Sequence, residues 1–219
     1  MGHRAALFDL DGTLLDTAPD LVGALNVLRR EEGLAEAPVA DFRAYVSQGS
    51  LGLIRAGLPP ADAAQESRWR QRFLDWYERN MLRATQPFQG VEGLLDELDR
   101  RAIPWAVVTN KPEFLTLPLL AQLGWKGRAG CVICGDTLTT AKPHPAPVLL
   151  ACELLGVEPA AAIMVGDDPR DMEAAEAAGT TPVLMSYGYG VQAALAAALP
   201  PAHVLDQPAE ILRLFANVS

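Results

Sequence analysis

The sequence predicts an α/β fold: a doubly wound parallel sheet that is interrupted after its first strand by an all-helical domain. Short apolar runs with the length of buried strands alternate with helical patterns through the second half of the chain. One such run, residues 5–8, stands apart near the N-terminus. From about residue 17 to residue 85 the pattern is helical throughout, so an insertion separates the first strand from all later ones.

The composition is that of an acidic globular protein. The chain has 219 residues, 50% of them hydrophobic, and a net charge of −9, which suits one large domain or two modest ones. The negative charge argues against nucleic acid and anionic membranes as partners. No apolar stretch reaches the roughly 20 residues that a membrane-spanning helix needs. Because no secretory signal is recognisable either, we expect the protein in the cytoplasm.

The three cysteines indicate thiols of the hydrophobic core rather than a metal or redox site. Cys131 and Cys134 have the spacing of a ligand pair, but residues three apart in a strand point to opposite faces. No second pair of Cys or His follows at a zinc-like distance. Cys152 lies in a helical pattern and has the same interpretation.

Two aspartates that follow the first predicted strand are the leading candidates for chemistry. Asp9 and Asp11 come directly after the apolar run, and Gly12 tolerates the turn that must follow. Open α/β sheets bind their ligands at the carboxyl ends of the strands. Two partly buried carboxylates so close stay ionised only with a cation or strong donors between them, and magnesium is the usual cation beside phosphate. Asp11-Gly12 alone is also compatible with an ordinary turn.

The two predicted domains are a sheet-containing core and an inserted cap. We assign residues 1–16 and 86–219 to the core and residues 17–85 to the helical cap. The place of the cap directly after the aspartate pair would let it act as a lid. An aromatic stripe on its last helix is more typical of a core face than of a cofactor site. The later strands of the core are predicted at residues 105–108, 131–134, 162–165, 182–185 and 204–205.

Polar residues also end three of the later strands. Thr109 and Asn110 follow the second strand, where a hydroxyl and backbone amides can hold phosphate oxygens, although a turn could use them as well. Lys142 follows the third strand and offers a charge suited to phosphate, although a lone lysine is usually solvated. Asp167 comes first after the fourth strand, and Asp171 lies in the first turn of the next helix.

These motifs, taken together, resemble those of the haloacid dehalogenase-like hydrolase superfamily, in the family's order. The resemblance covers nearly the whole chain, including a helical cap inserted after the first motif. Within the superfamily, the sequence is most similar to phosphoglycolate phosphatases. The matching stretches are Asp9-Leu10-Asp11-Gly12-Thr13-Leu14-Leu15-Asp16, its continuation Thr17-Ala18-Pro19-Asp20, Val46-Ser47-Gln48-Gly49, Thr109-Asn110, Lys142-Pro143 and Gly166-Asp167-Asp168-Pro169-Arg170-Asp171.

The resemblance implies a phosphatase that acts through an aspartyl-phosphate. Asp9 would be the nucleophile, Asp11 the general acid and base, and Lys142 the third catalytic residue. Mg²⁺ would be held by Asp9, the main-chain carbonyl of Asp11 and Asp167, with Asp171 in the shell around these ligands. A further set would bind the phosphoryl group of a small phosphorylated metabolite: Lys142, Thr109, Asn110 and the backbone near Leu10 and Gly12.

The resemblance leaves the substrate open. The first expectation is 2-phosphoglycolate. The second is N-acetylmuramic acid 6-phosphate, because three stretches in combination also resemble bacterial phosphatases for that sugar phosphate: Val107-Val108-Thr109-Asn110-Lys111-Pro112, Leu149-Leu150-Ala151-Cys152-Glu153 and Tyr187-Gly188-Tyr189. A phosphomutase of the same architecture and a catalytically silent binding module are further alternatives. In the cap, Arg55 could pair with a substrate carboxylate, although a surface position is its more ordinary interpretation.

Overall fold

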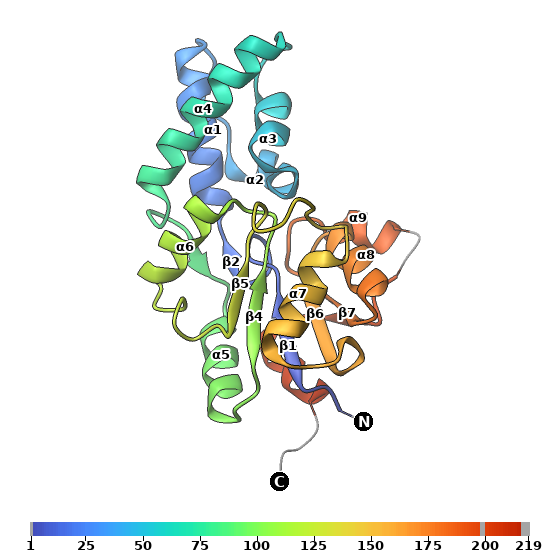
Figure 1. Cartoon of the computed structure of the whole chain (residues 1–219). Helices are drawn as coiled ribbons and strands as arrows, with labels where there is room; N and C mark the ends of the chain where they lie inside the picture. The colour runs from blue at the N-terminus through green and yellow to red at the C-terminus, as the bar shows by residue number, and fades with distance from the viewer. Residues whose placement is uncertain (1, 198–199, 216–219) are drawn as a thin grey trace. The chain divides into compact units, whose positions relative to one another are not determined.

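The computed structural model describes residues 2–197 and 200–215, and the chain divides into two compact units (Figure 1). The larger unit combines the segment that ends at Leu14 with the segment that begins at Pro87. The smaller unit is residues 15–86. The boundaries that we placed from the sequence, after residues 16 and 85, lie within two residues of these positions.

The larger unit contains the predicted parallel sheet. Over the described residues its six strands have the order β5-β4-β1-β6-β7-β8, so the first strand of the chain lies inside the sheet. The chain adds β4 and β5 on one side of β1 and then β6 to β8 on the other, which makes β1 the point where the direction of winding switches. The strands are β1 (Ala5–Phe8), β4 (Trp105–Val108), β5 (Cys131–Ile133), β6 (Ala162–Gly166), β7 (Thr181–Met185) and β8 (His203–Leu205).

The central strands are continuous apolar runs because both faces of the sheet are covered. On one face Leu7, Val108 and Met164 belong to a single cluster with side chains of α7 and α8. On the opposite face Phe8 meets Trp105 edge to face, with ring centroids 6.4 Å apart. The helices of this unit are α5 (Val91–Arg100), α6 (Glu113–Gln122), α7 (Ala146–Leu155), α8 (Pro169–Ala178) and α9 (Val191–Ala196), with 3₁₀ segments η2 (Pro159–Ala161) and η3 (Pro208–Leu214).

The smaller unit is helical between two short strands. Trp69, Phe73 and Tyr77 are buried on one face of its longest helix, so most of the aromatic stripe belongs to the core of this unit. Asp20 is also buried and accepts hydrogen bonds from the Thr85 amide (2.9 Å) and hydroxyl (2.8 Å). The elements are β2 (Leu15–Asp16), α1 (Ala18–Glu31), α2 (Val39–Phe42), η1 (Arg43–Gln48), α3 (Gly49–Gly57), α4 (Ala63–Asn80) and β3 (Gln86–Pro87), which pairs with β2.

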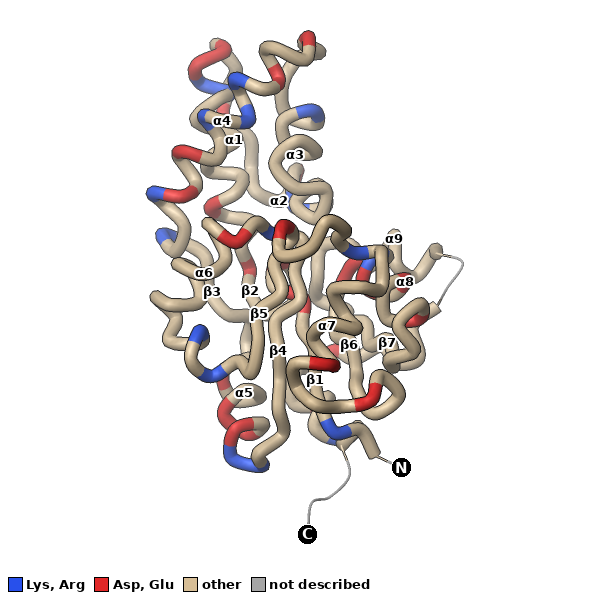
Figure 2. Tube along the Cα trace, in the orientation of Figure 1, with Lys and Arg blue, Asp and Glu red and all other residues tan. Residues whose placement is uncertain are grey.

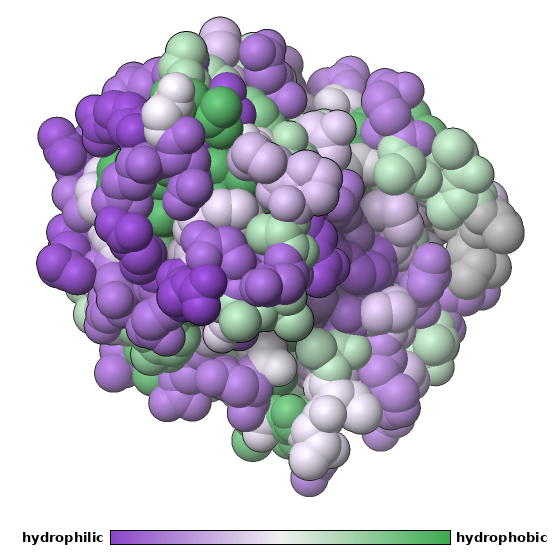
Figure 3. All heavy atoms as spheres, turned by 90° about the horizontal axis from the view of Figure 1, so that it is seen from above, coloured by the Kyte–Doolittle hydropathy of each residue, from purple (hydrophilic) through white to green (hydrophobic). Residues whose placement is uncertain are grey.

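The surface is polar on the face seen from above, and two of the three thiols are buried. The face seen in Figure 3 is mostly hydrophilic, with hydrophobic residues in small separate groups. No helix in the described ranges is both long and apolar enough to cross a membrane.

Cys134 and Cys152 are buried free thiols, Cys131 is half-buried, and burial raises the pKa of each to about 11. The thiols therefore stay protonated and unreactive at neutral pH.

Candidate active site

The polar residues that follow β1, β4 and β6 meet at the carboxyl edge of the sheet. Asp9 continues the pairing of β1, because its N–H donates to the Val165 carbonyl at 2.9 Å. The N–H of Thr109 likewise donates to the Ile133 carbonyl at 2.9 Å, and Asp167 follows β6 directly. Figure 2 shows acidic and basic residues close together beyond this end of the strands. Parallel strands thus bring to one place side chains that lie far apart in the sequence.

Lys142 lies at the centre of this group. Its side chain is 3% exposed, and Nζ donates to Asp9 Oδ1 at 2.9 Å, Asp171 Oδ1 at 2.7 Å and the Val108 carbonyl at 2.6 Å. Burial disfavours its charge, but the Asp171 and Asp9 carboxylates outweigh burial and place the pKa of Lys142 above its ordinary value. The lysine is therefore a fixed, charged component of the site rather than part of the solvated surface.

Asn110 uses its side-chain amide to hold the main chain of Lys142. Nδ2 donates to the Lys142 carbonyl at 2.8 Å, and Oδ1 accepts the Lys142 N–H at 3.0 Å. The amide that we predicted for phosphate binding is thus engaged within the protein. This two-bond contact ties the end of β4 to the segment that carries the lysine.

Asp171 fixes both the start of α8 and the lysine. Its Oδ1 accepts from Lys142, while its Oδ2 accepts the N–H groups of Asp167 and Asp168, each at 3.1 Å. Asp168 in turn caps the helix, and its Oδ1 accepts the Arg170 N–H at 3.0 Å. Asp171 therefore supports the groups around it through hydrogen bonds to each of its oxygens.

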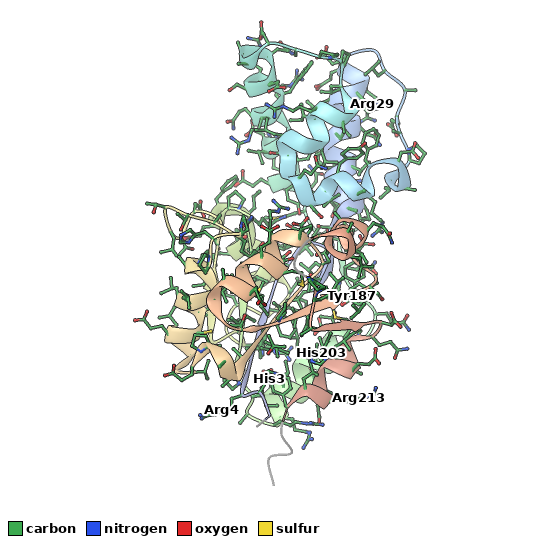
Figure 4. All side chains as sticks on the ribbon, turned by 90° about the vertical axis from the view of Figure 1, so that its right-hand side faces the viewer. His3, Arg4, Arg29, Tyr187, His203 and Arg213 are labelled. Carbon is green, nitrogen blue, oxygen red and sulfur yellow. The ribbon has the colours of Figure 1, made fainter. Side chains whose placement is uncertain are left out.

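The turn after β7 encloses Asp167. The sequence did not indicate this contact. Oδ2 of Asp167 accepts the N–H groups of Tyr189 (2.7 Å) and Gly190 (3.1 Å), and Oδ1 accepts the Thr13 hydroxyl (2.9 Å). A Cβ on Gly188 would lie 2.1 Å from Asp167 Cβ, so only glycine allows the backbone to approach so closely. The hydroxyl of Tyr187, the residue labelled in Figure 4, donates to the Thr13 carbonyl at 2.9 Å and so joins this turn to the first motif.

Burial and mutual repulsion make the carboxyl groups costly to ionise. Burial raises the pKa of Asp9 to about 7, although Lys142 opposes the rise. Burial, followed by the charges of Asp9 and Asp171, raises the pKa of Asp167 to about 8. A cation bound among these carboxylates would remove this cost.

The donor set fits a hard divalent cation. One carboxylate oxygen from each of Asp9, Asp167 and Asp171 lies within 4.8 Å of the others. Both oxygens of Asp171 already accept hydrogen bonds, Oδ1 from the Lys142 ammonium and Oδ2 from the N–H groups of Asp167 and Asp168, whereas Lys142 contacts Asp9 through Oδ1. The donor on Oδ1 of Asp167 is a neutral hydroxyl. Asp9 and Asp167 are therefore the side chains best suited as ligands.

Asp11 has a charged partner that we did not single out from the sequence. Lys111 Nζ lies 3.1 Å from Oδ1 and 3.2 Å from Oδ2 of Asp11. The available signal was modest: a lysine directly after the Thr-Asn pair that ends the second predicted strand. His3 and His203 precede or begin strands, so they lie at the amino end of the sheet, away from the site (Figure 4).

The chain is similar to a known family of hydrolases and to several of its members. Residues 3–179 match the family model described as haloacid dehalogenase-like hydrolase. A phosphoglycolate phosphatase from Xanthomonas campestris pv. campestris is 44% identical over 186 residues, which are 85% of this chain and 84% of that protein. An N-acetylmuramic acid 6-phosphate phosphatase from Pseudomonas aeruginosa is 37% identical over 190 residues, 86% of this chain and 84% of that protein. A crystal structure of a predicted phosphoglycolate phosphatase from Haemophilus somnus has a TM-score of 0.84 at 27% identity and covers 97% of both chains.

The fold and the carboxylate-rich edge of its sheet define a class of hydrolases. The chain belongs to the haloacid dehalogenase-like hydrolase family. Within that family it is a phosphoric monoester hydrolase of the phosphoglycolate phosphatase-like group, as the motifs predict.

Proposed function

We propose that the protein is a Mg²⁺-dependent phosphatase that hydrolyses 2-phosphoglycolate through an aspartyl-phosphate on Asp9. The observation that carries the chemistry is the junction of Asp9, Lys142 and Asp171, with Asp11 and Asp167 beside it. The substrate is proposed because the relative that is 44% identical is a phosphoglycolate phosphatase, from Xanthomonas campestris pv. campestris.

The proposed reaction has two steps, both at the phosphorus atom. In the first, a carboxylate oxygen of Asp9 attacks phosphorus, the bond to the leaving oxygen breaks, and Asp11 donates its proton to that oxygen. In the second, Asp11 takes a proton from water as the water oxygen attacks phosphorus. The Asp9–phosphorus bond then breaks, and inorganic phosphate leaves.

The phosphoryl group would be held by one charge and several neutral donors. Lys142 supplies the charge, and the Thr109 hydroxyl, whose oxygen accepts the Lys111 N–H at 3.1 Å, supplies a fixed donor. Backbone amides near Leu10 and Gly12 would complete the cradle, and Gly12 permits their turn with a φ of 91°. Asn110 would act through Lys142, whose main chain it holds.

Mg²⁺ would be held by the carboxylates of Asp9 and Asp167 and by the main-chain carbonyl of Asp11. When bound, it would offset the negative charge shared by the nucleophile and the phosphate. The neighbouring residues keep the two carboxylates in place: Lys142 holds Asp9, and the Tyr189 and Gly190 amides hold Asp167.

Without metal, we expect the free energy of unfolding to fall as the pH rises from about 4 to about 8. Asp9 and Asp167 have native pKa values of about 7 and about 8, above the ordinary value near 4. In this window the native state therefore binds more protons than the unfolded state, so a rise in pH favours the unfolded state until the native groups have also ionised. At a fixed Mg²⁺ concentration of about 100 times the Kd that holds at about pH 8, the metal should add about 2.7 kcal/mol at that pH. It should add less at about pH 6, where its Kd is higher, because it binds the deprotonated carboxylates.

Urea unfolding with chelator and with Mg²⁺ at the two pH values measures both effects. In Asp167→Asn the free energy of unfolding should fall less with rising pH, because one of the two carboxyl groups with a raised pKa is gone. An equal gain from Mg²⁺ at both pH values, or an unchanged fall in Asp167→Asn, would contradict the assignment.

We propose that residues 15–86 form a cap domain that selects the leaving group. The residues assigned above would contact only the phosphoryl group, Mg²⁺ and the oxygen atom that leaves, so they would not distinguish one leaving group from another. Arg55 has a partner within this unit: its guanidinium donates to Glu66 at 2.9 and 2.8 Å, with 63% of the side chain exposed. This pairing favours the surface interpretation of Arg55.

The second candidate substrate is N-acetylmuramic acid 6-phosphate, supported by the relative that is 37% identical. Phosphate release from a panel containing both esters and simple hexose phosphates, with Mg²⁺ and then with chelator, tests the proposal. We expect Mg²⁺-dependent release with the highest kcat/KM for 2-phosphoglycolate. A higher value for the sugar ester would select the second candidate, and no release from any ester would favour a phosphomutase or a silent binding module.

A further inference from the structure

Lys111 is a buried charge with its ammonium group against Asp11. The sequence has three lysines, and two of them, Lys111 and Lys142, lie at this site. The side chain of Lys111 is 4% exposed and that of Asp11 is 20% exposed. Because Nζ lies 3.1 and 3.2 Å from the two carboxylate oxygens, it faces both of them and opposes rotation of the carboxylate.

The main chain of Lys111 is fixed on both sides. Its N–H donates to the Thr109 hydroxyl oxygen at 3.1 Å, and its carbonyl accepts the Gly135 N–H at 2.9 Å and the Thr116 hydroxyl at 3.3 Å. A Cβ on Gly135 would lie 2.2 Å from the Asn110 carbonyl oxygen, so only glycine permits this approach. The long side chain therefore starts from a rigid base, which lowers the entropy lost in holding Nζ against Asp11.

We propose that Lys111 is a positioning residue for the proton-transfer step, a proposal that rests on the proposed function. Lys111 holds the Asp11 carboxyl group at the orientation from which it reaches the leaving oxygen. Its charge also stabilises the carboxylate that remains after Asp11 has given up its proton. A general acid must lie within hydrogen-bond reach of its acceptor, so a freely rotating Asp11 would donate less often.

This role makes the effect of Lys111 depend on the leaving group. An alkoxide needs a proton as it departs, whereas a nitrophenolate is stable without one, so proton donation accelerates only the alkyl esters strongly. The kcat/KM value reports the steps through phosphoryl transfer to Asp9, which include departure of the leaving group. The loss of Lys111 should therefore appear in kcat/KM for alkyl phosphates.

The experiment measures kcat/KM for ethyl phosphate, 2-phosphoglycolate and p-nitrophenyl phosphate in Lys111→Met. We expect a loss of about 10- to 100-fold for both alkyl esters and less than about 3-fold for the nitrophenyl ester. Lys126→Met, at an exposed lysine of the same unit, is the matched control and should change none of the three. Lys111→Gln keeps a neutral donor, and we expect the same pattern with a smaller loss, which gives a second test should Lys111→Met fold poorly.

Asp11→Asn separates this inference from the proposed function. Undiminished alkyl ester hydrolysis in Asp11→Asn would overturn the role of Asp11 itself. If Asp11→Asn is impaired but Lys111→Met affects all three esters equally, or only the carboxylate-bearing one, Lys111 binds substrate or supports the fold and the inference is wrong. In the Asp11→Asn background, Lys111→Met should have no further leaving-group-dependent effect.

Discussion

Asp9→Asn is expected to reduce turnover at least about a thousandfold, on the scale that loss of a nucleophile costs other enzymes. The amide keeps the shape of the carboxylate but cannot attack phosphorus. Stability should not fall at about pH 8, because the neutral amide avoids the cost of ionising a carboxyl group whose pKa burial raises to about 7. Phosphate release and urea unfolding measure the two effects.

Asp96→Asn is the matched control for this variant. The Asp96 side chain is 70% exposed on the surface of the same unit, so its replacement should leave turnover unchanged. Ordinary turnover by Asp9→Asn would exclude the nucleophile assignment. A loss of turnover together with a loss of the native circular dichroism spectrum would show a folding defect instead.

Lys142→Met should impair both catalysis and folding, because the lysine contacts Asp9, Asp171 and the Val108 carbonyl at once. Methionine fills a similar volume without charge, which leaves two buried carboxylates and a carbonyl without their common donor. We expect kcat/KM to fall at least about 100-fold and the free energy of unfolding to fall by about 3–5 kcal/mol at about pH 8.

The loss of stability in Lys142→Met should shrink toward about pH 5, since protonation of Asp9, whose pKa burial raises to about 7, removes one of the negative charges that the lysine balances. Urea unfolding at the two pH values measures this trend, and Lys126→Met again provides the control. Unchanged kinetics and stability in Lys142→Met would remove the lysine from the site.

The sequence predicted the fold because buried parallel strands have a direct signature. The run 105–108 coincides with β4, and the runs near residues 131, 162 and 182 match β5, β6 and β7 within one residue at each end. Strands buried on both faces must be continuously apolar, so a polar residue that follows one marks its end. The same signature predicted which residues would follow the strands at the carboxyl edge of the sheet.

The amino-acid pattern thus predicts the order of the elements and the residues that follow the strands. It does not predict which of those residues pair, because their contacts form only in the folded chain. Lys111 meets Asp11 across 100 positions of the chain, Lys142 meets Asp9 across 133, and the amides of Tyr189 and Gly190 close on Asp167. Local patterns arise from the repeat of a single helix or strand, whereas these pairs arise from the order of the strands in the sheet, which brings distant turns to the same edge.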